Sequence, residues 1–397
     1  MRKHIEKLEE SKINLATFIS FSFGFSQALL SYIMSNYFEI ASGMKNVGVF
    51  YLIAYSIFLV MLLNLHKVVG KFNRSKILNS SIVIKIIVIT FLALFPPGWF
   101  GIILLIIYII CSSLGWVSLD MILESCSNDS KSERIRGKYL TAMNLGIFLA
   151  PFISTQILIR FNYAGIFVAL LILNLFILFF ESSKVKRSYH DFNSKAKITT
   201  VLKKFFRKKN VCRIFYISFA LEFFYALMLI YTPIYMLSLG LGWDKIGIIF
   251  TFMLTPFLFL QYPVGILADK KTGEKEMLAI SVMIMGVAAL GIYFIDSTGI
   301  MIWSLILFSG RVGAALVEIL RDSYFYKRID GYDVDVIDFF RTARPIAYMV
   351  AAILSAIVIH LISIKAVFIL IGIVVLLALY PTFYLLDNKS EKDLVKI

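Results

Sequence analysis

The chain has 397 residues, of which 59% are apolar and 16% charged, and its mean hydropathy is +0.84. A soluble globular protein carries roughly a quarter charged residues, so the charges here are too few to cover a water-facing surface. Hydrocarbon requires every backbone amide to be paired internally, which leaves helices or closed barrels. The apolar runs are continuous, as in 102–111 and 164–180, whereas barrel strands alternate. The composition therefore predicts an all-α integral membrane protein.

In chain order, runs of about 20 mostly apolar residues predict twelve membrane spans. The first six lie near 13–37, 47–66, 77–95, 99–122, 138–159 and 163–180, and the second six near 211–238, 245–265, 277–295, 299–320, 342–362 and 366–386. We expect a six-helix bundle over 1–181, a basic cytoplasmic linker over 182–210 and a second six-helix bundle over 211–397. Residues 203–209 of the linker are basic and aromatic, which suits either a helix at the headgroups or a solvated connection.

The basic residues predict the orientation of these spans. With both termini cytoplasmic, 34 of the 40 Lys and Arg residues lie in cytoplasmic segments or at the adjoining span ends, four lie on the outside, and only Lys85 and Arg311 lie deep within spans. This is the bias of the positive-inside rule. The net charge of +15 therefore reflects membrane topology, with anionic lipid as the neighbour, and argues against a nucleic-acid partner.

Few residues suggest catalysis or metal binding. The four histidines are scattered without metal-ligand spacing, and neither a nucleophile elbow nor a nucleotide loop is present. The three cysteines show no pairing pattern and are expected to be reduced thiols. We therefore expect no enzyme activity, no metal and no cofactor.

The loop between the eighth and ninth predicted spans has glycine, acidic and basic residues at set spacings: Gly265, Asp269, Lys270, Gly273 and Lys275. A glycine lets two helices approach closely, an acid suits the positive end of a neighbouring helix, and a second glycine permits a tight left-handed turn. The loop resembles the signature loop of the major facilitator superfamily. The resemblance implies two pseudo-symmetric six-helix bundles, secondary active transport by alternating access, and a loop that closes the cytoplasmic side.

The same resemblance extends to the first half of the chain, in a shortened form. Gly70, Asn73 and Arg74 stand at the matching loop, with Asn73 where the family carries an aspartate. We expect this copy to be the electrostatically weaker gate. By the resemblance, Asp269 meets the start of the fifth span, at Arg134 and Arg136.

A second duplicated feature is a carboxylate pair at the end of the fourth and tenth spans. Each pair is spaced i, i+4 and so lies on one helical face, and a basic helix start follows each. Two interpretations of these acids stay open. They couple to transport, or they lie at the lipid boundary and are neutralised by the nearby arginines. The residues are Asp120 and Glu124, followed by Arg134 and Arg136, and Glu318 and Asp322, followed by Arg341 and Arg344.

Charges deep in a span usually face an aqueous path or a partner, because burying them costs several kcal/mol. Glu222 lies mid-span in the seventh segment and Arg311 in the tenth, helices that the family resemblance places around the central cavity. We expect these two residues, with Glu318 on the face of Arg311 and Tyr225 one turn from Glu222, to bind substrate and protons. The alternative is a static Glu222–Arg311 pair. Lys85, in the third span, is expected to be structural, with a role in substrate binding as the alternative.

The kind of transporter stays open. The fourth span, 101–124, lacks the arginine typical of drug:proton antiporters, and the fifth keeps Gly146 and Pro151 of their glycine-rich stretch. We expect a proton-coupled transporter of a small solute, exporting an amphipathic compound, that works as a monomer in a bacterial-type plasma membrane. A symporter or uniporter for a polar or anionic metabolite is the competing interpretation, followed by a membrane sensor that does not transport.

Overall fold

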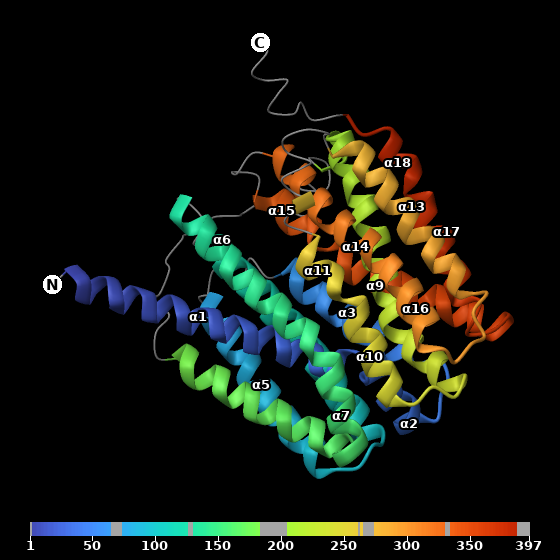
Figure 1. The fold of residues 1–397 in the computed structure, drawn as a ribbon, viewed down its shortest axis with the longest axis horizontal. Coiled ribbons are helices and arrows are strands. Elements are labelled where there is room, and N and C mark those ends of the chain that lie inside the picture. The colour runs from blue at the N-terminus through green and yellow to red at the C-terminus, as the bar shows by residue number, and fades with distance from the viewer. Residues whose placement is uncertain are drawn as a thin grey trace. The chain divides into compact units, whose positions relative to one another are not determined.

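A computed structural model of the protein describes residues 2–64, 74–125, 130–182, 205–260, 263–264, 274–329 and 334–386. The regular elements of these ranges are helices (Figure 1). They are α1 (Arg2–Ser31), α2 (Met34–Ser42), α3 (Gly48–Leu63), α5 (Arg74–Leu94), α6 (Trp99–Ser125), α7 (Ser130–Ser182), α9 (Lys209–Ser238), α10 (Trp243–Met253), α11 (Thr255–Phe259), α13 (Lys275–Ile292), α14 (Ile300–Lys327), α15 (Val334–Phe340), α16 (Ala343–Leu361), α17 (Val367–Leu377) and α18 (Leu379–Phe383).

The described helices have the length and composition of membrane spans. Eight stretches are long and apolar enough to cross a membrane, and Gly48–Leu63 and Val367–Phe383 are shorter apolar helices. The longest stretch, Thr141–Phe180, contains a non-helical residue, Asn162, with φ of 55°, between the predicted spans 138–159 and 163–180. The all-helical membrane class is confirmed, whereas the count of twelve and the cytoplasmic termini stay predictions.

The contacts of the chain form two compact units. Unit 1 comprises Met1–Lys45, Asn64–Phe192 and Ile246–Thr251. In it α1 packs against α7, α5 packs against α6 and α7, and α2 packs against α6. Its buried side chains include a cluster contributed by α1, α5 and α7: Phe23, Leu78, Ile82, Met143 and Ile177.

Glycine brings α1 and α7 together in unit 1. A Cβ at Gly146 would collide with the carbonyl oxygen of Phe21 and lie 2.8 Å from the amide nitrogen of Phe25. On the other helix, a Cβ at Gly24 would collide with the carbonyl oxygen of Met143. The two backbones therefore touch directly, as small residues allow in membrane helix pairs, because van der Waals packing drives association in lipid.

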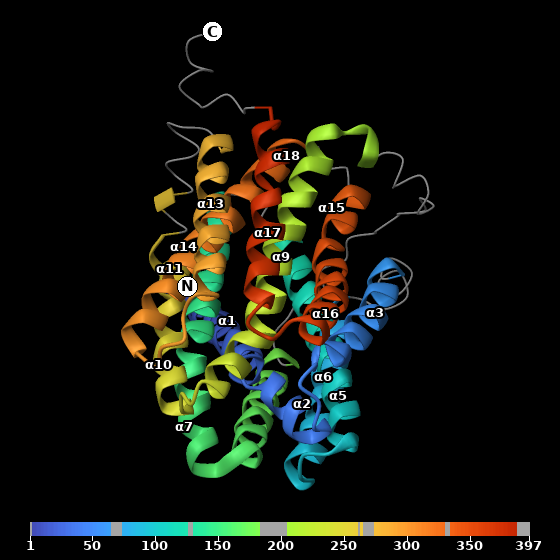
Figure 2. The same ribbon diagram turned by 90° about the vertical axis from the view of Figure 1, so that its right-hand side faces the viewer.

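Unit 2 comprises Asn46–Leu63, Asn193–Lys245 and Phe252–Ile397. Helix α9 packs against α14, α16 and α17, and α3 packs against α16. Helix α13 runs alongside α14 and α17, as Figures 1 and 2 show. The division of the chain at 182–210 into two six-helix bundles stays a prediction.

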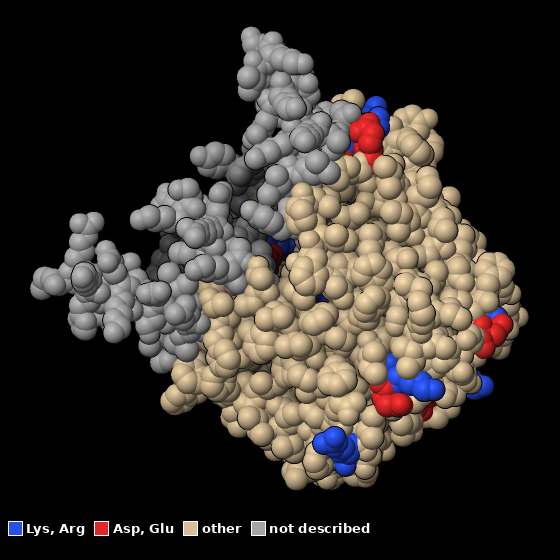
Figure 3. All heavy atoms as spheres, viewed as in Figure 1, with Lys and Arg blue, Asp and Glu red and all other residues tan. Residues whose placement is uncertain are grey.

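The described surface suits a lipid environment. Figure 3 shows a face on which the described residues are uncharged over most of the area, with Lys, Arg, Asp and Glu confined to a few groups. Large apolar side chains are exposed along the helices, among them Val60, Ile87, Ile172 and Phe259. Exposed apolar area on this scale would promote aggregation in water, so its solvent is the hydrocarbon of a bilayer.

Candidate functional site

Charged side chains gather in unit 2 where α9, α14 and α16 pack together. Glu222 and Tyr225 belong to α9, Arg311, Glu318, Arg321 and Asp322 to α14, and Arg344 to α16. We call the six ionisable residues Glu222, Glu318, Asp322, Arg311, Arg321 and Arg344 the charged cluster. Helical spacing explains the convergence, because Ser218, Glu222 and Tyr225 recur at i, i+4 and i+7 and thus share one face of α9.

Glu222 is an anion between two guanidinium groups. Its carboxylate lies 3.8 Å from Arg321 and 3.8 Å from Arg344. Arg321 also donates to Asp322 at 2.8 Å and to the hydroxyl of Ser218 at 2.9 Å. The geometry of Glu222 is therefore that of an ion-pair bridge that ties α9 to α14 and α16.

Glu318 has a different set of partners. The hydroxyl of Tyr225 donates to its carboxylate at 2.7 Å, and the side chains are partly buried. Among the described residues no Lys, Arg or His forms an ion pair with Glu318. Glu318 therefore has a neutral hydrogen-bond donor in the place where Glu222 has two cations.

Arg311 faces aromatic rings. Its guanidinium carbon lies 5.2 Å from the ring centroid of Tyr225 and 5.9 Å from that of Phe224. The residue is only 6% exposed, and in the part of the chain that the structure describes its Nε has no hydrogen-bond partner. The predicted grouping of Glu222, Tyr225, Arg311 and Glu318 is thus seen in space, but Glu222 forms its ion pairs with Arg321 and Arg344.

An aromatic pair adjoins the cluster at Arg344. The rings of Tyr55, from α3, and Tyr348, from α16, stack with centroids 4.1 Å apart, and the Arg344 guanidinium lies 5.8 Å from the ring centroid of Tyr348. Helix α3 therefore meets the charged cluster through an aromatic contact. Stacked rings and a cation over a ring face each contribute on the order of 1 kcal/mol.

Comparison with protein families decides the identity of the chain. The family model of the Major Facilitator Superfamily matches residues 13–328, most of the chain and the whole of α9 and α14. The protein belongs to the major facilitator superfamily. A comparison with curated proteins found no match.

As a member of this superfamily, the protein is a multi-pass membrane transporter of a small solute, and members of the family are transporters rather than enzymes. Its spans are surrounded by membrane lipid. Among the described residues, no three His, Cys, Asp or Glu side chains gather in a way that could hold a metal ion.

Most of the transporter's predicted gate loop lies outside the described residues. The residues outside the description are Gly70, Asn73, Gly265, Asp269, Lys270 and Gly273, and the side chains of Arg74, Arg134 and Arg136 are outside it as well. The described end of the second gate loop shows one feature that sequence reasoning missed. Glu274, 1% exposed, accepts hydrogen bonds from Lys327 at 2.5 Å and from Ser323 at 3.1 Å. This contact joins the start of α13, where Lys275 lies, to the end of α14.

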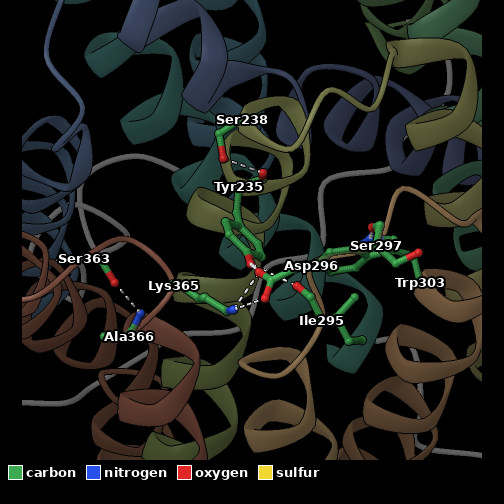
Figure 4. Close-up of polar contacts among 9 residues, drawn as sticks. All are labelled: Tyr235, Ser238, Ile295, Asp296, Ser297, Trp303, Ser363, Lys365 and Ala366. Atoms are coloured by element: carbon green, nitrogen blue, oxygen red, sulfur yellow. Dashed lines mark hydrogen bonds and ion pairs between the residues drawn. The ribbon is translucent and has the colours of Figure 1, made fainter.

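At the opposite end of α13 and α14 the transporter carries a second polar contact, shown in Figure 4. The ammonium of Lys365 donates to both carboxylate oxygens of Asp296 at 2.6 Å, and the hydroxyl of Tyr235 donates to the same carboxylate at 3.1 Å. The hydrogen bond from Lys365 holds the pKa of Asp296 below its usual value. Two loops, α13–α14 and α16–α17, are thereby fastened to α9.

Two other predicted site residues, and Lys85, have different surroundings. Asp120 lies near the end of α6 in unit 1, and Arg341 lies between α15 and α16 in unit 2. Lys85 is 2% exposed, and its ammonium lies 5.1 Å from the ring centroid of Tyr108 and 5.9 Å from that of Phe23. Cation–π contacts of this kind agree with the structural role expected for Lys85.

Sequence reasoning missed Arg321 and Tyr55 as members of the site. A signal for Arg321 was present, because it stands three residues after Glu318 and so shares part of its face. For Tyr55 the signal was absent, because only the packing of α3 on α16 brings it to Tyr348.

Proposed function

We propose that the protein is a secondary active transporter that couples movement of its solute to protons, with Glu318 as the group that takes up and releases the proton. The observation that supports this is the pairing of Glu318 with the neutral hydroxyl of Tyr225 at 2.7 Å. The ionisable neighbours of Glu318 are Glu222 and Tyr225 from α9, and Arg321 and Asp322 from α14. Proton exchange at Glu318 changes the net charge of the cluster by one.

Glu222 has a supporting role in this proposal. Its ion pairs keep Arg321 of α14 and Arg344 of α16 in place. A change in the charge of Glu318 therefore alters the contacts between the helices that surround the site. Alternating access requires a central site whose occupancy biases two arrangements of the helix bundles. A fixed ion pair beside an exchanging carboxyl group meets that requirement.

The finer features of the transporter belong to the same proposal. We take it to have twelve spans in two six-helix bundles with both termini cytoplasmic, to work as a monomer, and to reside in a bacterial-type plasma membrane. The cytoplasmic gate is formed by the loop with Asp269 and Arg136, with its weaker copy at Asn73. The supporting observations are the bias of basic residues and the match of the chain to the family.

The solute could move against the protons or together with them, and each alternative has a supporting observation. Export of an amphipathic compound in exchange for protons is favoured by the apolar and aromatic composition of α9 and by the kept Gly146 and Pro151. Symport of a polar or anionic metabolite is favoured by a specific observation, the Arg311 guanidinium that lies over two rings without a carboxylate partner in the described residues.

Flux through proteoliposomes tests the proposal. The purified protein is reconstituted, and movement of labelled carboxylates, amines and amphipathic dyes is measured with and without an imposed pH gradient. We expect flux that depends on the gradient and that loses this dependence in Glu318→Gln. Asp322→Asn is the matched control, because this acid is 44% exposed and bonds the adjacent residue Arg321. Equal flux with and without the gradient in the wild type would reject proton coupling.

A further inference from the structure

One cation of the charged cluster forms no ion pair with a described residue. Arg321 contacts the carboxylates of Glu222 and Asp322, and Arg344 contacts that of Glu222. Arg311 forms no ion pair and donates no hydrogen bond among the described residues, although only 6% of it is exposed. Its charge is therefore not compensated by an ion pair within the part of the chain that the structure describes.

Burial of an unpaired guanidinium is costly, because the group gives up water for a surrounding of low dielectric. The two ring faces of Phe224 and Tyr225 recover only part of this cost. Arg311 stands eleven residues into α14, about 17 Å along the helix, so a rigid helix rather than a loop positions it. A buried, rigidly held cation with unused hydrogen-bond donors has the geometry of an anion-binding site.

We propose that Arg311 binds the anionic group of the transported solute, and that this solute is a monocarboxylate with an apolar body. The planar guanidinium matches the two oxygens of a carboxylate in a bidentate pair. A single charge follows from the single unpaired cation of the cluster. The apolar body follows from Phe224 and Tyr225, whose rings border the guanidinium and would pack against a hydrocarbon or aryl group.

The assignment rests on the proposed function, because it names the substrate class of the same site. It also explains why Arg311 is not paired with Glu222, although both lie on neighbouring helices of unit 2. Glu222 is already shared by two guanidinium groups. The solute's carboxylate would supply the missing anion and would be released when transport ends.

Equilibrium binding to the full-length protein in detergent tests this assignment. The probes are the sodium salts of acetate, butyrate, octanoate and benzoate, each compared with its uncharged amide at the same concentration and ionic strength. We expect at least one carboxylate to raise the midpoint of thermal unfolding, and its amide to leave the midpoint unchanged. The dissociation constant of that carboxylate, measured by calorimetry, should increase about 30-fold or more in Arg311→Gln.

Two further variants keep the result interpretable. Arg311→Lys retains the charge without the planar fork and should weaken binding about tenfold. This variant also serves if Arg311→Gln does not elute as a monodisperse protein. Lys85→Met removes another buried cation, from unit 1, and should leave the dissociation constant unchanged.

The outcomes separate this assignment from the proposed function. No stabilisation of the wild type by any of the four carboxylates, equal stabilisation by an amide, or unchanged binding in both Arg311 variants overturns the role of Arg311. Carboxylate binding that depends on Arg311, combined with flux that ignores the pH gradient, would reject proton coupling and leave the anion site standing.

Discussion

Substitution of Glu222 by glutamine removes the anion shared by two guanidinium groups. Each ion pair spans 3.8 Å, which at an effective dielectric constant of 20 corresponds to about 4 kcal/mol of gross attraction. Breaking a fully buried pair costs about 3–5 kcal/mol. Here the side chains of Arg321, Glu222 and Arg344 are 11%, 15% and 42% exposed, and Arg321 keeps Asp322. We therefore expect Glu222→Gln to lower the free energy of unfolding by about 2–3 kcal/mol.

For a unit of this size, that loss corresponds to a fall of about 5–10 °C in the midpoint of thermal unfolding, measured by intrinsic fluorescence in detergent. The matched control is Asp322→Asn, which removes an exposed partner of the same arginine and should cost less than about 1 kcal/mol. A Glu222→Gln variant no less stable than the Asp322→Asn variant would refute the role of Glu222 as the anchor of Arg321 and Arg344.

Three further predictions concern other polar contacts. Tyr225→Phe keeps the ring but removes the hydrogen bond to Glu318, so it should lower stability by about 1–2 kcal/mol and reduce gradient-driven flux. Lys85→Met should leave flux unchanged and raise the unfolding midpoint, because a buried ammonium gives way to an apolar side chain of similar length. Asp296→Asn should speed hydrogen exchange at 293–299 and 363–366. In the wild type that exchange, corrected for its intrinsic rate, should be constant from pH 5 to 8, because the lowered pKa of Asp296 keeps it ionised and paired with Lys365 throughout this range.

The helical membrane class could be predicted from the sequence because the bilayer imposes a local rule. Every span needs a long apolar run with its hydrogen bonds made internally, and such runs are visible without knowledge of neighbours. The break at Asn162 agrees with this rule. Hydropathy places one predicted span on either side of it, and the structure has a non-helical residue of positive φ at that position within the stretch labelled α7.

The partners within the site depended on information that a single helix does not contain. Depth in the membrane marked Glu222 and Arg311 as functional candidates, because residue number converts to height at 1.5 Å per residue. Which side chains meet depends on the rotation and tilt of each helix about its neighbours. Packing of α9 on α14 and α16 therefore directs Glu222 to Arg321 and Arg344, and it leaves Arg311 to the rings of Phe224 and Tyr225.

The same packing gives two glutamates of one cluster opposite properties. Glu222 contacts two guanidinium groups, whereas Glu318 contacts a phenol hydroxyl and forms no ion pair among the described residues. In the proposed mechanism, the ion pairs of Glu222 hold the helices, and a change of charge at Glu318 shifts their equilibrium. Tyr225 contacts both proposed binding groups, because its hydroxyl donates to Glu318 and its ring lies against the Arg311 guanidinium. Protonation of Glu318 and binding of an anion at Arg311 would thus both change the contacts of the Tyr225 side chain.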